Sequence, residues 1–487
     1  MMKIGIHIFR RDLRVYDNIS LYECYKEMDI VIPIFIFTPH QITKDNKYIS
    51  YKSIQFMIES LFDLENQLKQ LNNTKKSPIM FFYGNVIDVL NSIKERININ
   101  SIYINLDYTP YSKERDLSIK SFCNKMNIKY NEYHDICLFP PKTILTDNIS
   151  TYKKFTPFYN KCMENISSIQ KINKNSSKIN NISFIQNKNI YSSFLSIKEN
   201  INLIDIYKID KNFYPDKNKH INGGTKESLK ILEKMKRFVN YDKERNDMNK
   251  QTTNLSAYLK FGCISIRQTY YSMLKISPDL VRQLIWRDFY IHLVDAYPQL
   301  LKGKSLNVKY DNIKWRNNKE WFNKWCRGET GYPIVDACMQ QLNQSGYMHN
   351  RGRLIVSSFL IKILQIDWRW GEKYFANKLI DYDPSVNNGN WQWSSGSGAD
   401  SQPYFRIFNP YLQSFKYDKD ALYIKKWLSS VNVKINDVPA KHLHQWNKYH
   451  SLYDLTKINY YSPIVEYDKM KENTIKMYEE AVSKKMN

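Results

Sequence analysis

The sequence predicts an α/β domain with a parallel sheet at the N-terminus, followed by a larger all-helical domain. In the first 140 residues, short apolar runs rich in Ile and Phe alternate with helical spacing, as in buried parallel strands joined by helices. From residue 223 onward the helical spacing continues, with Pro and Gly at the joints. All ten tryptophans lie after residue 285, so aromatic binding surfaces are expected in the second half of the chain.

The N-terminal domain is expected to span residues 1–140. Its strands are the apolar runs at residues 3–9, 30–37, 79–83 and 101–106. Between the second and third runs, residues 53–71 place apolar side chains at helical spacing. FRRDLR follows the first strand, where a Gly-rich phosphate loop would stand, so a standard dinucleotide site is not expected there.

Two further segments complete the expected organisation. Residues 141–222 are rich in Lys, Asn, Ser and Ile and have weak periodicity, so a long, partly irregular interdomain connector is expected. Residues 223–487 form the expected helical domain, whose last helix ends near Ser483.

Charge and composition narrow the class of protein. A net charge of +24 favours an acidic partner, and nucleic acid is the first candidate. The seven cysteines lie far apart without metal-ligand spacing, so reduced thiols and no metal site are expected. No apolar run approaches the roughly 18 residues of a membrane span, and the N-terminus does not resemble a signal peptide. A soluble intracellular protein without membrane contact is expected.

The stretch DYDPSVNNGNWQWSSGSGADSQPYFRIFNP, residues 381–410, is the most informative part of the sequence. It contains two carboxylates, an amide pair and two tryptophans: Asp381, Asp383, Asn387, Asn388, Trp391 and Trp393. The glycines that follow let a ligand approach the backbone, because glycine has no Cβ. A metal, a nucleophile or a phosphate loop does not explain this mixture. A large planar cofactor with polar edges does.

Two helix faces carry unusual polar residues. In QLIWRDFYIHL, helical spacing gives one shared face to Gln283, Trp286, Arg287 and Tyr290. In GYMHNRGRLIV, a second face contains Asn350, Arg353 and Leu354. Amide, indole, guanidinium and phenol groups together are too polar for an ordinary core. They suit a flat, carbonyl-rich guest such as a flipped-out pair of bases.

Together these stretches resemble the DNA photolyase/cryptochrome family, most closely the microbial class I photolyases that split cyclobutane pyrimidine dimers. The resemblance runs from FRRDLRVYDN to about Trp427, with a poor match only in the middle. It implies a light-driven DNA repair lyase in which excited FADH⁻ passes an electron to the dimer. It also implies an FAD-binding role for the helical domain, UV-damaged single- or double-stranded DNA as substrate, and a monomer.

The resemblance assigns a set of cofactor-binding residues. They are Tyr241, Thr252, Thr253, Leu255, Ser256, Gln283, Arg287, Asn350, Arg353, Asp381, Asp383 and Asn387. QTTNLSAYLKFG, residues 251–262, matches the phosphate site, where a helix start favours an anion. Asn387 matches the residue that faces flavin N5, and Arg353 the one that pairs with Asp381. Asp383 is expected to hydrogen-bond to the polar edge of the ring.

The resemblance also assigns residues to DNA and to electron transfer. Those for the lesion or DNA are Gln283, Trp286, Arg287, Tyr290, Asn350, Leu354, Trp393, Arg245, Arg351 and Arg406. Three tryptophans match the family's chain from flavin to surface: Trp391, Trp368 and Trp315. With Asn387, Gln283 and Asn350, these three form the expected catalytic set.

Two other segments match structural parts of the family. The polar residues of FRRDLRVYDN are expected to form salt bridges between the domains rather than to act in catalysis: Arg10, Arg11, Asp12, Arg14, Asp17 and Asn18. TYKKFTPFYNKC, residues 151–162, matches a second structural segment.

Two departures from the dimer-splitting enzymes keep alternatives open. Gln283 stands where they usually carry Glu, and Leu354 where they usually carry Met. Gln is what (6-4) photolyases have, but those enzymes need histidines at the positions of Asn350 and Leu354. A (6-4) photolyase is therefore one alternative. A non-repairing, cryptochrome-like blue-light photoreceptor is another, and a flavoprotein that binds DNA without turnover is a third. The antenna chromophore, whether folate, deazaflavin or flavin, is left open.

Overall fold

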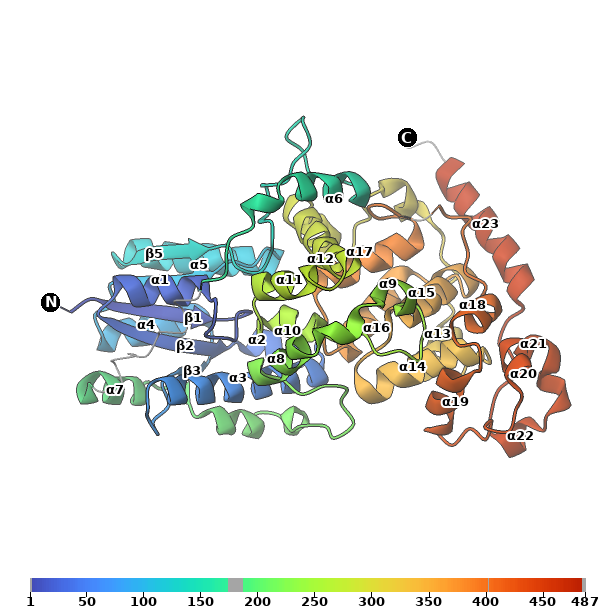
Figure 1. Ribbon diagram of the computed structural model, residues 1–487, viewed down its shortest axis with the longest axis horizontal. Helices are drawn as coiled ribbons and strands as arrows, with labels where there is room; N and C mark the ends of the chain where they lie inside the picture. The colour runs from blue at the N-terminus through green and yellow to red at the C-terminus, as the bar shows by residue number, and fades with distance from the viewer. Residues whose placement is uncertain (1, 174–186, 402, 484–487) are drawn as a thin grey trace.

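The computed structural model confirms an α/β domain and a larger helical domain, which lie side by side (Figure 1). The structure describes residues 2–173, 187–401 and 403–483. The sheet and its helices form one end of the molecule, and the C-terminal helices form the other.

One six-stranded sheet organises the α/β domain, in the order β5-β4-β1-β2-β3-β6. The strands are β1 (Ile4–Phe9), β2 (Ile30–Phe37), β3 (Met80–Tyr83), β4 (Ser101–Asn105), β5 (Lys129–Tyr133) and β6 (Asn200–Ile201). β1 to β5 run parallel, and Ile6 of the central strand pairs with Ile32 and Ile102. Every residue of β1 and β2 is buried, as expected for strands covered by helices on both faces.

The four predicted strands are confirmed, and two edge strands were missed. β5 has the sequence KYNEY, whose side chains are half-buried or exposed, so it lacks the apolar run that marks a buried strand. β6 comes from the connector and pairs antiparallel with β3. Its two residues are too few for periodicity to reveal.

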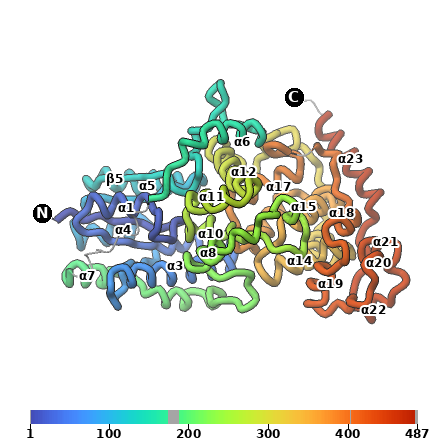
Figure 2. The backbone as a smooth tube through the Cα atoms, in the orientation of Figure 1, coloured from blue at the N-terminus to red at the C-terminus, as the bar shows by residue number. Residues whose placement is uncertain are grey.

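Helices cover the sheet and continue into the connector. They are α1 (Ile19–Glu27), α2 (Pro39–Ile42), α3 (Tyr51–Leu71), α4 (Val86–Arg96), α5 (Pro110–Lys125), α6 (Phe155–Glu164) and α7 (Lys188–Leu195). The predicted helix over residues 53–71 is α3, whose N-cap Ser50 accepts a hydrogen bond from the Ser53 backbone. In the backbone trace, α7 lies beside the α/β domain, far from the C-terminus (Figure 2).

Helices make up most of the second domain. They are α8 (Thr225–Glu233), α9 (Tyr241–Glu244), α10 (Ser256–Phe261), α11 (Ile266–Leu274), α12 (Pro278–Ala296), α13 (Lys319–Arg327), α14 (Pro333–Ser345), α15 (Asn350–Ser358), α16 (Trp368–Lys378), α17 (Pro384–Ser395), α18 (Pro410–Tyr417), α19 (Leu422–Ser429), α20 (Ala440–His444), α21 (Trp446–Tyr449), α22 (Leu455–Ile458) and α23 (Tyr467–Ser483). Pro begins α12, α14, α17 and α18, and left-handed glycines end several helices, as the sequence predicted. Among the described helices, none has the length and hydropathy of a membrane span.

The segment after β1 joins the two domains through partly buried ion pairs. Arg11 pairs with Asp107 of the α/β domain and with Asp383 of the helical domain. Gly262 makes this approach feasible, because it has a left-handed φ of +65° and a Cβ there would lie 2.1 Å from the Arg11 carbonyl oxygen.

A second buried network lies beside the first. Arg267 pairs with Asp17 at 2.8 Å and with Asp135 at 2.6 Å, and Arg14 also pairs with Asp135 at 2.6 Å. Removing one member of such a network leaves a buried charge without its partner, which costs about 3–5 kcal/mol. The interdomain salt bridges that the sequence predicted for this segment are therefore present.

Candidate functional site

A cavity of about 630 Å³ lies within the helical domain, between α10, α12, α15 and α17. We call it the helical-domain cavity. Its walls include most residues that the sequence selected: Tyr241, Arg245, Thr252, Thr253, Leu255, Ser256, Gln283, Trp286, Arg287, Tyr290, Asn350, Arg351, Arg353, Leu354, Asp381, Asp383, Asn387, Trp391 and Trp393. The volume is in the usual range for a cofactor or substrate site.

α12 supplies one wall, and the predicted polar face does point into the cavity. Trp286 stacks on Phe155 of α6, with ring centroids 3.6 Å apart. Tyr290 lies over Gly389 of α17, where a Cβ would come within 2.1 Å of the phenol ring. Gln283 donates its amide Nε2 to the Asp279 carbonyl at 3.1 Å, so its oxygen remains available to a guest.

A polar end is formed where α10 and α15 meet the segment before α17. The expected pair is present: Arg353 Nη2 lies 3.0 Å from Asp381. The Ser256 hydroxyl, at the first residue of α10, donates to the same carboxylate at 2.7 Å. The Thr252 hydroxyl lies 3.1 Å from the Tyr347 hydroxyl. Hydroxyls, a guanidinium and the start of a helix therefore gather around the Asp381 carboxylate.

Both carboxylate oxygens of Asp383 accept hydrogen bonds from other groups of the protein. Its Oδ1 caps α17 by accepting hydrogen bonds from the backbone N–H groups of Ser385 and Val386, at 3.0 and 3.2 Å. Its Oδ2 accepts from Arg11. Burial alone would raise the pKa of Asp383, but the charges of Arg11 and Arg287 and the hydrogen bond from the Val386 backbone together lower it. Asp383 is thus a carboxylate that caps α17 and binds Arg11. Its expected hydrogen bond to the polar edge of the cofactor ring stays a prediction.

The three tryptophans assigned to electron transfer lie in different surroundings. Trp391 of α17 is 3% exposed and packs edge-on against Phe375, with ring centroids 5.0 Å apart. Gly371 permits this packing, since a Cβ there would lie 2.2 Å from the indole. Trp368 is buried on α16, outside the lining of the helical-domain cavity. Trp315 is half-buried and packs edge-on against Tyr478, with ring centroids 6.1 Å apart. Electron transfer along these three residues stays a prediction.

The arginines assigned to DNA differ in position. Arg245 and Arg351 line the cavity. The Arg351 guanidinium lies 4.2 Å from the centre of the Tyr417 ring, and burial lowers the pKa of Arg351. Arg406 lies outside the cavity lining, in the segment before α18. The prediction that Arg406 contacts DNA therefore does not depend on the cavity.

Sequence reasoning missed several residues of this site. Glu372 lies behind Asn387 and accepts its amide Nδ2 at 3.0 Å. Tyr347, Arg282 and Tyr382 also line the cavity. The signals were weak: Glu372 lies four residues after Trp368, and Tyr347 stands inside GYMHNRGRLIV. A single residue next to a motif does not reveal which way its side chain points.

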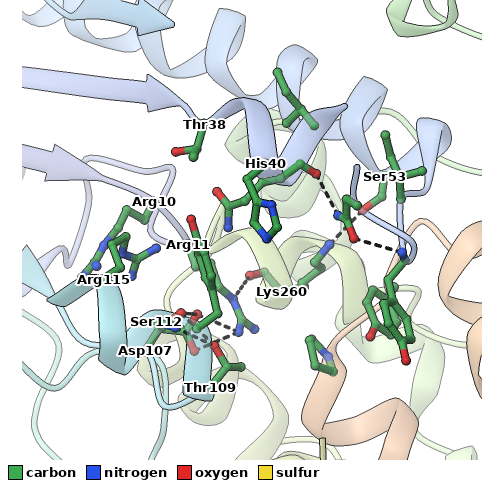
Figure 3. A pocket seen from close by; sticks show the side chains of 18 of the residues that line it. Arg10, Arg11, Thr38, His40, Ser53, Asp107, Thr109, Ser112, Arg115 and Lys260 are labelled. Carbon is green, nitrogen blue, oxygen red and sulfur yellow. Dashed lines mark hydrogen bonds and ion pairs between the residues drawn. The ribbon is translucent and has the colours of Figure 1, made fainter. Parts of the chain in front are cut away.

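A second cavity, of about 720 Å³, lies where the parallel strands end and the two domains meet (Figure 3). We call it the sheet-edge cavity, and the sequence did not locate it. Arg10 and Arg115 lie next to each other on one side, and Lys260 with Ser53 lies on the other. Ligands commonly bind at this edge of a parallel sheet.

The charges of the sheet-edge cavity favour an anion. Within the described residues, the buried Arg10 Nε and Arg115 Nη2 atoms have no hydrogen-bond partner. Burial and the neighbouring Arg10 lower the pKa of Arg115. Lys260 lines both cavities, and burial together with the Arg11 charge lowers its pKa to about 7.

Two family models match the chain. The model described as FAD binding domain of DNA photolyase matches residues 280–480, and the model described as DNA photolyase matches residues 5–176. Together they take in both domains. The first includes most of α12 and all of α15 and α17, which form much of the helical-domain cavity.

Curated relatives match over nearly the whole chain. Deoxyribodipyrimidine photo-lyase of Buchnera aphidicola subsp. Acyrthosiphon pisum (strain APS) is 36% identical over 497 residues, which cover 97% of this chain and 96% of that protein. The protein of the same name from Escherichia coli (strain K12) is 31% identical over 494 residues, covering 97% and 98%.

Solved structures have the same fold. The archaeal photolyase from Sulfolobus tokodaii, solved with two FAD molecules, has a TM-score of 0.82 and 34% identity over 98% of this chain and all of that one. A bacterial class III photolyase from Agrobacterium tumefaciens has a TM-score of 0.85 and 27% identity, covering 99% and 98%. A cryptochrome from Synechocystis sp. PCC6803 has a TM-score of 0.83 and 25% identity, covering 98% and 99%.

Proposed function

The chain belongs to the DNA photolyase family, and we propose that its helical-domain cavity is where cyclobutane pyrimidine dimers in DNA are split with the energy of light. It is an enzyme of DNA repair, FAD is its cofactor and damaged DNA is its substrate. The observation that carries the assignment of the site is the meeting of the Arg353–Asp381 pair, Asn387 and the aromatic face of α12 around one cavity.

The residues of the cavity fit FAD. The polar end at Thr252, Ser256 and Arg353 suits the phosphates and the ring edge, while Trp391 and Phe375 supply apolar walls. Bound reduced FAD supplies the redox chemistry, by giving an electron to the dimer after excitation and taking it back. Arg353 and Asp381 orient the cofactor, and Asn387 presents an amide to it.

The dimer enters the same cavity from the α12 side. Trp286, Tyr290 and Trp393 provide flat surfaces for unstacked bases, and each base–aromatic stack is worth roughly 1–3 kcal/mol. Gln283 and Asn350 hydrogen-bond to the base edges as neutral groups. Arg245, Arg351 and Arg406 bind phosphates of the strand that carries the lesion.

We place a second, light-harvesting chromophore in the sheet-edge cavity. The unpaired Arg10 Nε and Arg115 Nη2 atoms favour a chromophore with a phosphate or another anionic group. The photolyase from Sulfolobus tokodaii was solved with two FAD molecules. Mass analysis of the small molecules released by denaturation tests both sites, and a protein that releases no flavin contradicts the whole proposal.

Lesion choice is tested by illuminating the reduced protein with separately prepared substrates, one with a cyclobutane dimer and one with a (6-4) product. We expect dimers alone to be repaired, because Asn350 and Leu354 cannot supply the protons that two histidines would. Gln283→Glu is expected to retain dimer repair. Turnover of the (6-4) product with the dimer untouched would assign the enzyme to the other branch.

A further inference from the structure

Lys362 is a lysine in the interior of the helical domain. It lies in a π-helical turn, Phe359–Ile363, that continues directly from α15, and it is 1% exposed. Such turns are rare and often occur at functional sites. In the part of the chain that the structure describes, no carboxylate forms an ion pair with Lys362, and burial lowers its pKa well below the ordinary value. A methionine of similar length would fill the same space without the cost of burying an amine, so the contacts of the amine need an explanation.

The amine of Lys362 joins segments that are distant in the sequence. Its Nζ donates to two carbonyl oxygens, each at 3.2 Å: that of Ser395, the last residue of α17, and that of Tyr404. Tyr404 belongs to residues 403–409, which lead into α18 and which we call the pre-α18 segment. Lys362 Nζ also lies 3.6 Å from the centre of the Tyr478 ring. One amine therefore connects a helix of the cavity, the pre-α18 segment and α23.

Two buried residues of α23 complete this cluster. The Tyr478 hydroxyl donates to the Ser395 carbonyl at 2.8 Å, so that carbonyl accepts from both Tyr478 and Lys362. The Tyr478 ring stacks on the Tyr404 ring, with centroids 5.7 Å apart and planes that differ by 7°. The Thr474 hydroxyl donates to the backbone oxygen of Lys362. The place of the pre-α18 segment relative to α17 is therefore set by polar contacts as well as by packing.

The pre-α18 segment carries Arg406, which we propose as a phosphate contact. Arg406 is exposed, and its backbone N–H donates to the Pro403 carbonyl at 2.9 Å. Beyond it, the Phe408 backbone N–H donates to the hydroxyl of Ser358, the last residue of α15, at 3.3 Å. The segment is thus bonded to α15 and its π-helical turn on both sides of Arg406. The same helix begins at Asn350, in the cavity wall.

A phosphate contact needs more than an exposed arginine. The backbone that carries it must keep a fixed place relative to the cavity, because phosphate contacts set the register of the strand. We propose that Lys362 and Tyr478 are positioning residues that fix the pre-α18 segment, so that Arg406 meets a phosphate of the DNA whose dimer lies in the helical-domain cavity. This inference rests on the proposed function, because it takes Arg406 as a DNA contact. Both positioning residues lie outside the described lining of the cavity.

The test is a double-mutant cycle. Lys362→Met keeps the length of the side chain and removes both hydrogen bonds, and it is made in the wild type and in Arg406→Gln. Lys378→Met is the matched control, because it also removes one lysine. Lys378, on α16, lies 5.4 Å from the centre of the Tyr374 ring and donates to no carbonyl among the described residues.

Two kinds of measurement are made on FAD-loaded protein. The first is the affinity for an undamaged duplex at several salt concentrations. The second is the repair rate at saturating dimer-containing DNA, together with the FAD content. We expect Lys362→Met to lower the slope of log K against log salt concentration by about 1, the contribution of one phosphate contact, as Arg406→Gln does. The repair rate at saturating DNA should not change, since the cavity residues stay in place.

The double variant is the decisive protein. It should have the slope of Arg406→Gln alone, because a contact that is already absent cannot be lost again. Lys378→Met should keep the wild-type slope. If Lys362→Met does not fold, Tyr478→Phe serves instead, since it removes the hydroxyl bond to the Ser395 carbonyl and keeps the ring. The same lack of additivity with Arg406→Gln is then expected.

The outcomes separate this inference from the proposed function. A wild-type slope in Lys362→Met would overturn the role of Lys362 while the contact of Arg406 stands. Equal losses of affinity in the wild-type and Arg406→Gln backgrounds, with a reduced FAD content, would mean that Lys362 only supports the fold, and would also overturn the inference. An unchanged slope in Arg406→Gln itself would contradict the proposed DNA contact and this inference with it.

Discussion

Trp286 lies flat on Phe155: their ring centroids are 3.6 Å apart and their planes differ by 6°. Phe155 is the first residue of α6, in the connector, whereas Trp286 lies in the cavity wall on α12. The Arg282 guanidinium covers the Phe155 ring at 5.1 Å. The connector segment that the sequence described as structural therefore packs against the α12 wall of the helical-domain cavity, where we propose that the lesion binds.

Replacing Phe155 by Ala should weaken binding of dimer-containing DNA, although Phe155 does not line the cavity. The stack is worth about 0.5–1.5 kcal/mol beyond its buried area, so a loss of up to about tenfold is expected. Phe158→Ala is the matched control, because Phe158 is on the same helix and packs on Phe289 as Phe155 does, whereas the stack on Trp286 belongs to Phe155. Equal losses in both variants, after correction for the folded fraction, would indicate a general packing effect.

Trp286→Ala should reduce lesion binding more than Gln283→Ala does. The reason is that stacking of one base contributes roughly 1–3 kcal/mol, against about 0.5–1.5 kcal/mol for one neutral hydrogen bond. Titration of dimer-containing and undamaged DNA against each variant measures the difference. A larger loss for Gln283→Ala would mean that hydrogen bonding, rather than stacking, holds the dimer.

Trp315→Phe or Trp368→Phe should block the light-driven reduction of oxidised FAD. Dimer repair by FAD that has been reduced chemically should survive, because that electron does not pass through these side chains. The two activities are measured on the same preparations. Loss of both together would show that the tryptophans are needed for packing, as the burial of Trp368 would permit.

Binding to undamaged DNA should weaken steeply with salt, as the release of counterions requires. Each phosphate contact adds about 0.9 to the slope of log K against log salt concentration. Arg245→Gln and Arg406→Gln should each reduce the slope by about 1, if each contacts one phosphate. Arg327→Gln, on α13 and ion-paired with Glu329, is the control and should leave the slope unchanged.

Asp288→Asn should change how stability depends on pH. Asp288 of α12 accepts the backbone N–H groups of Leu138 and Phe139 at 2.8 and 3.0 Å, and burial raises its pKa from 3.8 to about 7. The folded protein therefore binds this proton more tightly than the unfolded chain. The contribution of Asp288 is most favourable below pH 4 and is lost as the pH rises to about 7.

The asparagine cannot take up that proton. Its curve of unfolding free energy against pH should therefore lack this decline, and the difference between the two proteins should grow between pH 4 and 7. Denaturant titrations at several pH values measure it. Parallel curves for wild type and variant would mean that Asp288 titrates in the folded protein as it does in the unfolded chain.

The sequence by itself determined those elements whose residues follow a local hydrophobic or polar periodicity. β1 and β2 were readable because buried parallel strands need continuous apolar runs, and α3 because its apolar side chains repeat every three or four residues. The polar face of α12 was readable for the same reason, since residues at i, i+3, i+4 and i+7 share one side of any helix. The motif around Asn387 was specific enough to indicate the family.

Only the tertiary structure decided which distant residues meet. β6 joins the sheet through pairing with β3, more than a hundred residues earlier in the chain, and its own two residues carry no periodic signal. The Phe155–Trp286 stack, the Asn387–Glu372 pair and the sheet-edge cavity all depend on how separate elements pack. The spacing of residues along one helix predicts which side chains share a face of that helix. It does not predict which other element that face contacts. The contacting element is set by the long-range packing of the core. A shift of one helix by one turn would bring other side chains together.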